Sequence, residues 1–303
     1  MNKSGTICTV VVTYNRLALL KECIQGILNQ SFPIDKIIIV NNGSTDGTGD
    51  YLQTLDLPQF EIITQANLGG AGGFHTGIKR AYESGYDWIW VMDDDVEPFR
   101  DCLENLLQFQ EKSKCMHPLR VFSDNNEVFE WEHYFDHRTC MPIIHHNISL
   151  EHKNYCYVNT ACFEGMLIHR DIVEKIGFPK TEYFIAGDDT EYGILANLYT
   201  NVLYTKEAVM YRKRTVVSHK IRPLQAYYEY RNLFLLRKNI KPYFPGNFSS
   251  LFYKNLYKDC FAKIMAVLKG KEYSFSEKKL LIGKMIKGIQ DGKKIYKTNN
   301  QKK

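Results

Sequence analysis

The first hundred residues alternate between two hydrophobic periods, and this alternation is the strongest constraint on the fold. Short apolar runs typical of buried parallel strands alternate with stretches whose apolar residues recur at helical spacing. The predicted strands are residues 7–12, 36–40, 60–64 and 88–92, and the predicted helices include residues 17–28 and 74–82. Strands and helices in this order predict an α/β fold with a doubly wound, mostly parallel, Rossmann-like sheet.

Each predicted strand ends in a polar cluster, and the carboxyl ends of parallel strands lie at one edge of a sheet, where ligands bind. A glycine-rich segment, residues 67–73, follows the third strand. It is not a P-loop, because Ile78 and not a lysine follows Gly77, and a dinucleotide fingerprint would follow the first strand. By itself this segment is equally well explained as a flexible turn before a helix.

Three consecutive aspartates, Asp93, Asp94 and Asp95, follow the fourth strand. Their charges repel one another and would be costly beside a buried strand without a cation. In an extended chain residues two apart point to the same side, so Asp93 and Asp95 can share one hard divalent ion, Mn²⁺ or Mg²⁺. The alternative is an acidic helix start.

Four motifs occur in order along this region, at residues 11–16 (VVTYNR), 41–46 (NNGSTD), 67–74 (NLGGAGGF) and 93–95 (DDD). Together they resemble the nucleotide-sugar domain of inverting glycosyltransferases of family two, which have the GT-A fold. The branch that the chain resembles most is the bacterial galactofuranosyltransferase and rhamnosyltransferase group. The resemblance covers about residues 7–235.

The resemblance implies a domain plan and a role for each motif. Residues 1–240 would form the GT-A domain, with a nucleotide-sugar half at 1–114 and an acceptor and catalytic-base half at 115–240. Asp93 and Asp95 would hold Mn²⁺ or Mg²⁺ across the donor diphosphate. The other residues implied to hold the donor are Thr13, Asn15, Arg16, Asn42, Asn67, Gly70, Gly72, Gly73 and Asp94. Among them, Asn42 would bond the base.

Residues 182–192 (EYFIAGDDTEY) resemble the acidic motif of the family, in which an aspartate is the catalytic base. Asp189 is the expected base, with Asp188 and Glu191 as its acidic neighbours. Adjacent carboxylates favour keeping one proton in the cluster, which raises an apparent pKa towards the range useful for accepting a hydroxyl proton. The alternative is that Asp188 or Asp189 only caps a helix over residues 190–198.

Two departures from the family pattern concern the metal and the acceptor. Where the family usually has a metal-binding histidine, this chain has Arg212, and the nearest histidine is His219. Either His219 is the third metal ligand, which we favour slightly, or Arg212 contacts the diphosphate directly. Where close galactofuranosyltransferases have paired tryptophans, this chain reads NTACFEG at 159–165.

The charge is unevenly distributed along the chain. Residues 204–303 hold 24 Lys and Arg against 6 acids, whereas residues 1–203 carry a net charge of −13. Because the candidate chemistry lies in the acidic part, nucleic acid is not an expected partner. A tyrosine-rich helix at 227–236 is expected to pack on the catalytic domain, with Arg231 bonded to an acidic partner.

Residues 241–303 are expected to form a basic helical region. Its apolar residues recur at helical spacing among lysines, from Phe252 to Leu268. Such a helix suits an anionic membrane surface, at about 1 kcal/mol per cation, and equally well packs on the core. No apolar run reaches the roughly 18–20 residues of a membrane span, no secretory leader is seen, and the eight cysteines form no CxxC pair. These features predict a cytoplasmic protein, peripheral at most on the inner face of the membrane.

The expected function is therefore a metal-dependent inverting glycosyltransferase. Its expected donor is UDP-galactofuranose, with dTDP-rhamnose as the alternative. Its expected acceptor is a hydroxyl of a growing, lipid-linked bacterial cell-surface polysaccharide. The competing hypotheses are a catalytically silent nucleotide-sugar-binding or scaffold subunit and, disfavoured by the missing glycine fingerprint, a nicotinamide-dependent oxidoreductase. The sequence leaves the oligomeric state open.

Overall fold

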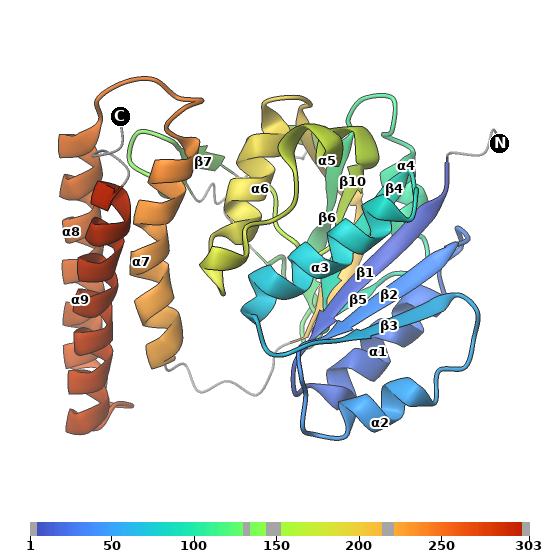
Figure 1. Ribbon diagram of the computed structural model, residues 1–303, viewed down its shortest axis with the longest axis horizontal. Coiled ribbons are helices and arrows are strands. Elements are labelled where there is room, and N and C mark those ends of the chain that lie inside the picture. The colour runs from blue at the N-terminus through green and yellow to red at the C-terminus, as the bar shows by residue number, and fades with distance from the viewer. Residues whose placement is uncertain (1–4, 130–133, 144–152, 214–220, 299–303) are drawn as a thin grey trace.

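The computed structural model describes residues 5–129, 134–143, 153–213 and 221–298. A sheet covered on both faces by helices lies beside a group of three long helices (Figure 1). The strand order β3-β2-β1-β4-β10-β6-β11-β5, with β9 paired to β11, confirms the predicted doubly wound sheet. The strands of this sheet are β1 (Ile7–Thr13), β2 (Lys36–Asn41), β3 (Phe60–Thr64), β4 (Trp88–Asp93), β5 (Val96–Pro98), β6 (Cys115–Phe122), β9 (Tyr155–Val158), β10 (Met166–His169) and β11 (Val202–Arg212).

Strands β1 to β4 are mutually parallel, whereas β10 runs antiparallel to β4 and to β6. The helices around the sheet are α1 (Leu17–Leu28), α2 (Thr48–Gln53), α3 (Gly69–Glu83), α4 (Cys102–Leu107), α5 (Arg170–Ile176) and α6 (Asp188–Asn197). Alternate residues of β1 point to opposite faces. Ile7 and Val11 therefore pack with α1 and α4, while Val10 and Val12 pack with α3, α5 and α6.

Helix α3 begins earlier than the predicted start at residue 74, so the glycine-rich segment is largely the first turn of a helix and not a loop. Close packing explains two of its glycines. A Cβ at Gly73 would lie 2.4 Å from Val12 Cγ1, and one at Gly77 would lie 2.2 Å from Val10 Cγ1. Glycines four residues apart on one helical face thus let α3 lie directly against β1.

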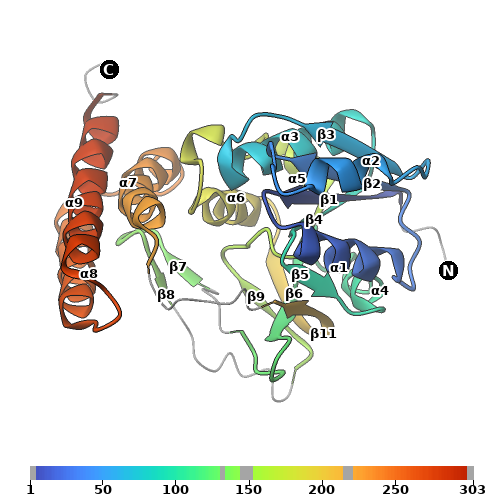
Figure 2. The ribbon, with the colours of Figure 1, turned by 90° about the horizontal axis from the view of Figure 1, so that it is seen from below.

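The C-terminal helices are α7 (Pro223–Ile240), α8 (Ser249–Lys269) and α9 (Phe275–Thr298). They share one hydrophobic core, and Figure 2 shows them standing side by side away from the sheet. Phe252, Leu256 and Cys260, part of the apolar stripe predicted for a membrane or for the core, are buried in it. Because α7 packs with α8 and α9, the division that we predicted at residue 240 cuts through this core.

Helix α7 also joins the helical core to the segment that precedes α6. The side-chain amide of Asn232 donates to the carbonyl oxygens of Tyr183, Ile185 and Ala186, at 3.0, 2.8 and 2.7 Å. Arg231 bonds the carbonyl oxygen of Glu182, not the acidic side chain that we predicted. The smaller elements nearby are the 3-10 helix η1 (Thr181–Tyr183) and the hairpin of β7 (Tyr134–Asp136) and β8 (Met141–Ile143). In the described ranges no helix has both the length and the apolar character needed to span a bilayer.

Candidate active site

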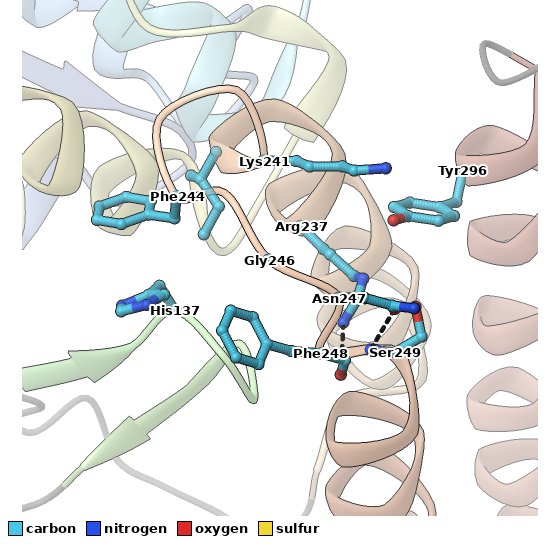
Figure 3. A pocket seen from close by; sticks show the side chains of 10 residues that line it. His137, Arg237, Lys241, Phe244, Gly246, Asn247, Phe248, Ser249 and Tyr296 are labelled. Atoms are coloured by element: carbon cyan, nitrogen blue, oxygen red, sulfur yellow. Dashed lines mark hydrogen bonds between the residues drawn. The ribbon is translucent and has the colours of Figure 1, made fainter.

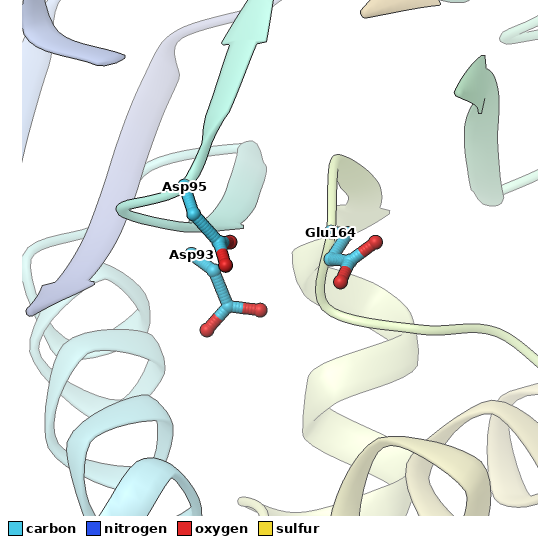
Figure 4. A group of neighbouring side chains, drawn as sticks. All are labelled: Asp93, Asp95 and Glu164. Atoms are coloured by element: carbon cyan, nitrogen blue, oxygen red, sulfur yellow. The ribbon is translucent and has the colours of Figure 1, made fainter. Parts of the chain in front are cut away.

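The site lies at the carboxyl ends of β1 and β4, as expected for a doubly wound sheet. Asp93 is the last residue of β4, and Asp94 and Asp95 form the turn into β5. Figure 4 shows Asp93 and Asp95 on one side and Glu164, from the segment before β10, on the other. One oxygen from each of the three carboxylates lies within 4.8 Å of the others.

Thr13 and Arg16 organise the aspartates. The Thr13 hydroxyl donates to Asp94 Oδ2 at 2.7 Å. One nitrogen of Arg16 donates both to Asp94 Oδ1, at 3.0 Å, and to Asp95 Oδ2, at 2.9 Å. Thr13 is buried, and its hydroxyl is used in the bond to Asp94. The Arg16 side chain remains 35% exposed, so it can also contact a ligand.

The three asparagines predicted to hold the donor all have contacts within the protein. Asn15, with a positive φ of 53°, accepts from the backbone N–H of Thr45 at 2.6 Å and so links two loops. Asn42 is buried, donates to the carbonyl oxygen of Gly69 at 3.0 Å, and accepts from Gln65 at 2.8 Å. Asn67 is exposed and accepts from the N–H of Gly69 at 2.9 Å. In this structure the Asn42 amide therefore supports the start of α3, and its contact with a base stays a prediction.

The predicted donor-binding glycines differ in what surrounds them. A Cβ on Gly70 would meet nothing within 4 Å, so this position faces open space. At Gly72 it would lie 2.3 Å from Leu68 Cβ, and at Gly73 it would strike β1. Gly69, with a φ of +73°, leaves room for the carbonyl oxygen of Phe184, which would lie 1.9 Å from a Cβ. Of the three predicted glycines, Gly70 alone has the open approach that a ligand needs.

Glu164 is a site residue that the sequence reasoning missed. We considered its segment, residues 159–165, only as a departure from the tryptophans of the family. In the structure Arg120 pairs with Glu164 Oε2, and Arg212 pairs with Oε1 at 3.1 Å. Both guanidinium groups also lie over the Phe129 ring, at 5.0 and 4.1 Å from its centroid. A lone glutamate carried no sequence signal, because its partners are more than 40 residues away on β6 and β11.

The carboxylates of the site are short of positive charge. Burial, Asp95 and Glu164 raise the pKa of Asp93 well above its usual range. Burial likewise raises the pKa of Asp95, although Arg16 opposes it. Within the described residues the Asp93 side chain has neither a hydrogen bond nor an ion pair. A hard divalent cation ligated by Asp93, Asp95 and Glu164 fits this all-oxygen donor set.

Arg212 therefore lies beside the predicted metal site, where it contacts Glu164. His219, the ligand that we slightly favoured, falls outside the residues that the structure describes. With Glu164 in place, three carboxylates could ligate a cation even without a histidine.

Asp188 and Asp189 begin α6, whose N-cap is Gly187, and Asp189 Oδ1 accepts from the backbone N–H of Thr190 at 2.6 Å in the first turn. Burial and the neighbouring Asp189 raise the pKa of Asp188 to about 8. Burial raises the pKa of Asp189 to about 6, and Glu164 contributes to the increase. Asp189 is thus a carboxyl group whose pKa is raised towards the range useful for a general base. It also lines a cavity of about 370 Å³, as a general base must to reach a ligand.

Glu191, the third acidic residue of the predicted group, is held by contacts of its own. It is buried, where it accepts from the Tyr183 hydroxyl, from Asn239 at 2.8 Å, and pairs with Lys180 at 2.6 Å. Residues two apart on an α-helix point about 200° from each other, so Glu191 faces away from the side of Asp189. Its contacts make it an anchor of α6 on α7, and its charge still contributes to the raised pKa of Asp188.

A second, smaller pocket of about 90 Å³ lies at the α7–α8 junction (Figure 3). Phe244 and Phe248 lie beside His137, whose ring stacks on Phe244 at 4.5 Å. Arg237 in this pocket bonds Ser249 Oγ at 3.0 Å. No residue of the acidic site lines this pocket.

The family model described as "Glycosyl transferase family 2" matches residues 8–177. Among characterised relatives, the chain is similar to galactofuranosyltransferase GlfT1 of Mycolicibacterium smegmatis, with 27% identity over 202 residues. That match covers 63% of this chain and 65% of the relative, slightly less than two thirds of the relative's length.

Two solved structures share the fold. Staphylococcus aureus TarS 1-349 in complex with UDP-GlcNAc has a TM-score of 0.58 at 12% identity, over 98% of this chain and 92% of that one. GalNAc-T7 with UDP, GalNAc and Mn²⁺ has a TM-score of 0.60 at 12% identity, over 95% of this chain and 55% of that one. At such identities the likeness shows the GT-A fold and no more.

Replacing Glu164 tests its place in the cation site. Glu164→Gln keeps the shape of the side chain but removes one ligand charge, so we expect the affinity for Mn²⁺ to fall by about tenfold or more. Isothermal titration calorimetry with Mn²⁺ measures the change in affinity. Glu61→Gln, on β3 and bonded to Arg80, is the control and should bind Mn²⁺ like the wild type. Equal Mn²⁺ affinities of the wild type and the two variants would show that Glu164 is not a metal ligand.

Proposed function

Because the chain belongs to glycosyltransferase family 2, we propose that it is a metal-dependent inverting enzyme that transfers galactofuranose from UDP-galactofuranose. The proposed acceptor is a hydroxyl of a growing, lipid-linked cell-surface polysaccharide. One observation carries the proposal: the carboxylates of Asp93, Asp95 and Glu164 gather at the sheet edge, and Glu164 is close enough to raise the pKa of Asp189. A cation site and a base thus lie within electrostatic reach of each other.

The choice of donor rests on the relatives. The Mycolicibacterium relative is named a galactofuranosyltransferase, and both structural neighbours were solved with UDP or a UDP-sugar. These names favour a uridine diphosphate donor with galactofuranose as its sugar. dTDP-rhamnose is the alternative, because the sequence motifs resemble both branches of the family.

The proposed mechanism divides the work between two sets of residues. Asp93, Asp95 and Glu164 would hold Mn²⁺ or Mg²⁺, which would neutralise charge on the departing diphosphate. Arg16, bonded to Asp94 and Asp95, keeps two of the aspartates in place and adds a positive charge at the donor side. Asp189 takes the proton from the acceptor hydroxyl as that oxygen attacks the anomeric carbon. Attack from the side opposite the leaving group inverts the anomeric configuration.

Screening donors tests the reaction class and the sugar together. We expect hydrolysis of UDP-galactofuranose in the presence of Mn²⁺ and its loss when EDTA is added. UDP release from a panel of nucleotide sugars, including dTDP-rhamnose, measures this. If dTDP is released from dTDP-rhamnose faster than UDP from UDP-galactofuranose, dTDP-rhamnose is the donor. Release from none of the donors, with binding retained, would favour the catalytically silent subunit.

Asp189→Asn tests the base. We expect a loss of transfer of about 10²–10⁴-fold with unchanged UDP binding, because the amide cannot accept the hydroxyl proton. In the wild type the base must be ionised, and the pKa of Asp189 is raised to about 6. Turnover should therefore be full above this pH and fall as the pH drops through it. Glu182→Gln, at an exposed acid nearby, is the control. Transfer by Asp189→Asn near the wild-type rate would assign the base elsewhere.

We further propose that the turn between α8 and α9 contacts an anionic membrane. Since the stripe around Phe252 is buried, the apolar groups left for a membrane lie elsewhere. Phe275 is 85% exposed and Leu268 48% exposed, and they flank this turn at the lower end of the helices in Figure 1. Four lysines (Lys269, Lys271, Lys278 and Lys279) and two glutamates (Glu272 and Glu277) accompany them, which leaves a local net charge of +2. Exposed apolar side chains in a region of net positive charge suit an anionic lipid surface.

Substituting the two apolar residues tests this surface. Leu268→Ser with Phe275→Ser should weaken binding to phosphatidylglycerol vesicles by about tenfold or more, the value of one buried large apolar side chain. Co-sedimentation measures binding, and the unfolding midpoint should not change. The control is Tyr199→Ser, at an exposed residue of the α/β part. Sedimentation of the double variant like the wild type would rule out the turn as the lipid contact.

A further inference from the structure

The cavity of about 370 Å³ that contains Asp189 is larger than the base alone requires. Its walls come from the β7–β8 hairpin, the start of α6, and helices α7 and α8. The volume lies within the range of about 300–1,000 Å³ typical of pockets that bury small ligands. The mechanism above assigns a role to Asp189 and none to the rest of the lining.

One wall of the cavity is a charged trio: Glu229 on α7, and Asp259 and Lys263 on α8. The Lys263 ammonium lies 3.5 Å from Glu229 Oε2 and 3.5 Å from Asp259 Oδ2. These distances exceed those of close charge-assisted hydrogen bonds, about 2.7–2.9 Å. Tyr230 donates to Asp259 Oδ2 at 2.8 Å and so fixes one member of the trio. All three charged side chains keep about a third of their surface exposed, at 31%, 38% and 39%.

The wall of the cavity formed by the β7–β8 hairpin is apolar, with Phe135, Met141 and Pro142 lining it. A wall of carboxylates and an ammonium can accept from and donate to hydroxyl groups. An apolar wall can cover the C–H face of a ring. A sugar ring combines these two kinds of surface, with hydroxyls at its edge and C–H groups on its faces. The cavity therefore has the chemistry of a saccharide site.

The charges of the cavity also restrict which sugar can enter. Asp189, Glu229 and Asp259 bring three carboxylates against the single ammonium of Lys263. Burial lowers the pKa of Lys263, but Glu229 and Asp259 raise it by more, so the ammonium stays charged. An acidic sugar or a phosphorylated one would add a like charge to a partly buried acidic site, which is unfavourable.

We propose that this cavity binds the acceptor sugar itself, as a neutral ring whose attacked hydroxyl points to Asp189 and whose other hydroxyls bond the Glu229–Asp259–Lys263 trio. The inference rests on the proposed function and adds the acceptor class: a neutral hexose or deoxyhexose, not a uronic acid or sugar phosphate. It also gives α8 a part in substrate selection. Residues of the C-terminal helices would then decide which glycan end is extended.

Methionine-methyl NMR on the full-length protein tests binding directly. Met141 lines the cavity, whereas Met116 is buried in the sheet, so the two methyl groups report the site and a control position. We expect neutral methyl hexosides to shift the Met141 signal and leave Met116 unchanged. The methyl uronide of the same configuration should need a concentration at least about tenfold higher to produce the same shift of the Met141 signal. No shift with any hexoside, or equal affinity for the uronide, would overturn the proposal.

Substitutions in the trio test its role. Lys263→Met should weaken hexoside binding by about tenfold, the effect of one lost charged hydrogen bond. Glu229→Gln should reduce the difference in binding affinity between the methyl hexoside and the methyl uronide, because it removes one negative charge from the cavity. Lys258→Met, at an exposed lysine of the same helix, should match the wild type in both respects. Lys258→Met should also retain Mn²⁺-dependent donor hydrolysis. Full hexoside affinity in Lys263→Met would show that the trio does not bind the sugar.

The two proposals fail in different ways. Donor hydrolysis without a Met141 shift would leave the proposed function intact and overturn the acceptor site. A Met141 shift without hydrolysis of any donor would do the reverse.

Discussion

The central constraint on this protein is the crowding of six carboxylates at one edge of a sheet: Asp93, Asp94, Asp95, Glu164, Asp188 and Asp189. Three arginines from separate elements partly offset their charge. Arg16 follows β1 and bonds two of the aspartates, while Arg120 and Arg212 hold Glu164 from β6 and β11. Because Asp93 is left without such a partner among the described residues, the site still favours a cation. The strand order brings these charges together, since β6 and β11 are neighbours.

Helix α7 connects this charge cluster to the C-terminal helices. Phe184 and Ala186 have positive φ angles of 64° and 68°, which non-glycine residues rarely adopt. The Asn232 amide holds this strained segment through its three bonds to backbone carbonyls. The segment leads directly into Asp188 and Asp189, so the position of the proposed base depends on a residue of α7. The helical core therefore supports the proposed active site and also carries the lipid-facing turn that we propose.

Sequence patterns predicted the parts that depend on local chemistry. The four leading strands agree with the structure to within one residue, since short apolar runs of this kind are typical of parallel strands. The DDD motif lies at the predicted strand end for the same reason. Patterns were less informative where a side chain's partner is distant. Glu164 was missed, and so were the contacts of Glu191 with Tyr183 and Asn239. Thr13 and Asn42 also bond protein groups, and their contact with a donor stays a prediction.

The amino-acid sequence by itself therefore determined the doubly wound sheet, its family and the acidic character of the site, because hydrophobic period and motif spacing are local properties of the chain. Tertiary structure decided which carboxylates act together, since Glu164 joins Asp93 and Asp95 only after β10 pairs with β4. Tertiary structure also decided which apolar residues of the basic C-terminal region are buried and which stay exposed. The same apolar stripe could face lipid or protein, and packing against α7 buries Phe252 and Leu256 while leaving Phe275 exposed. That choice depends on the partner surface, which no local pattern records.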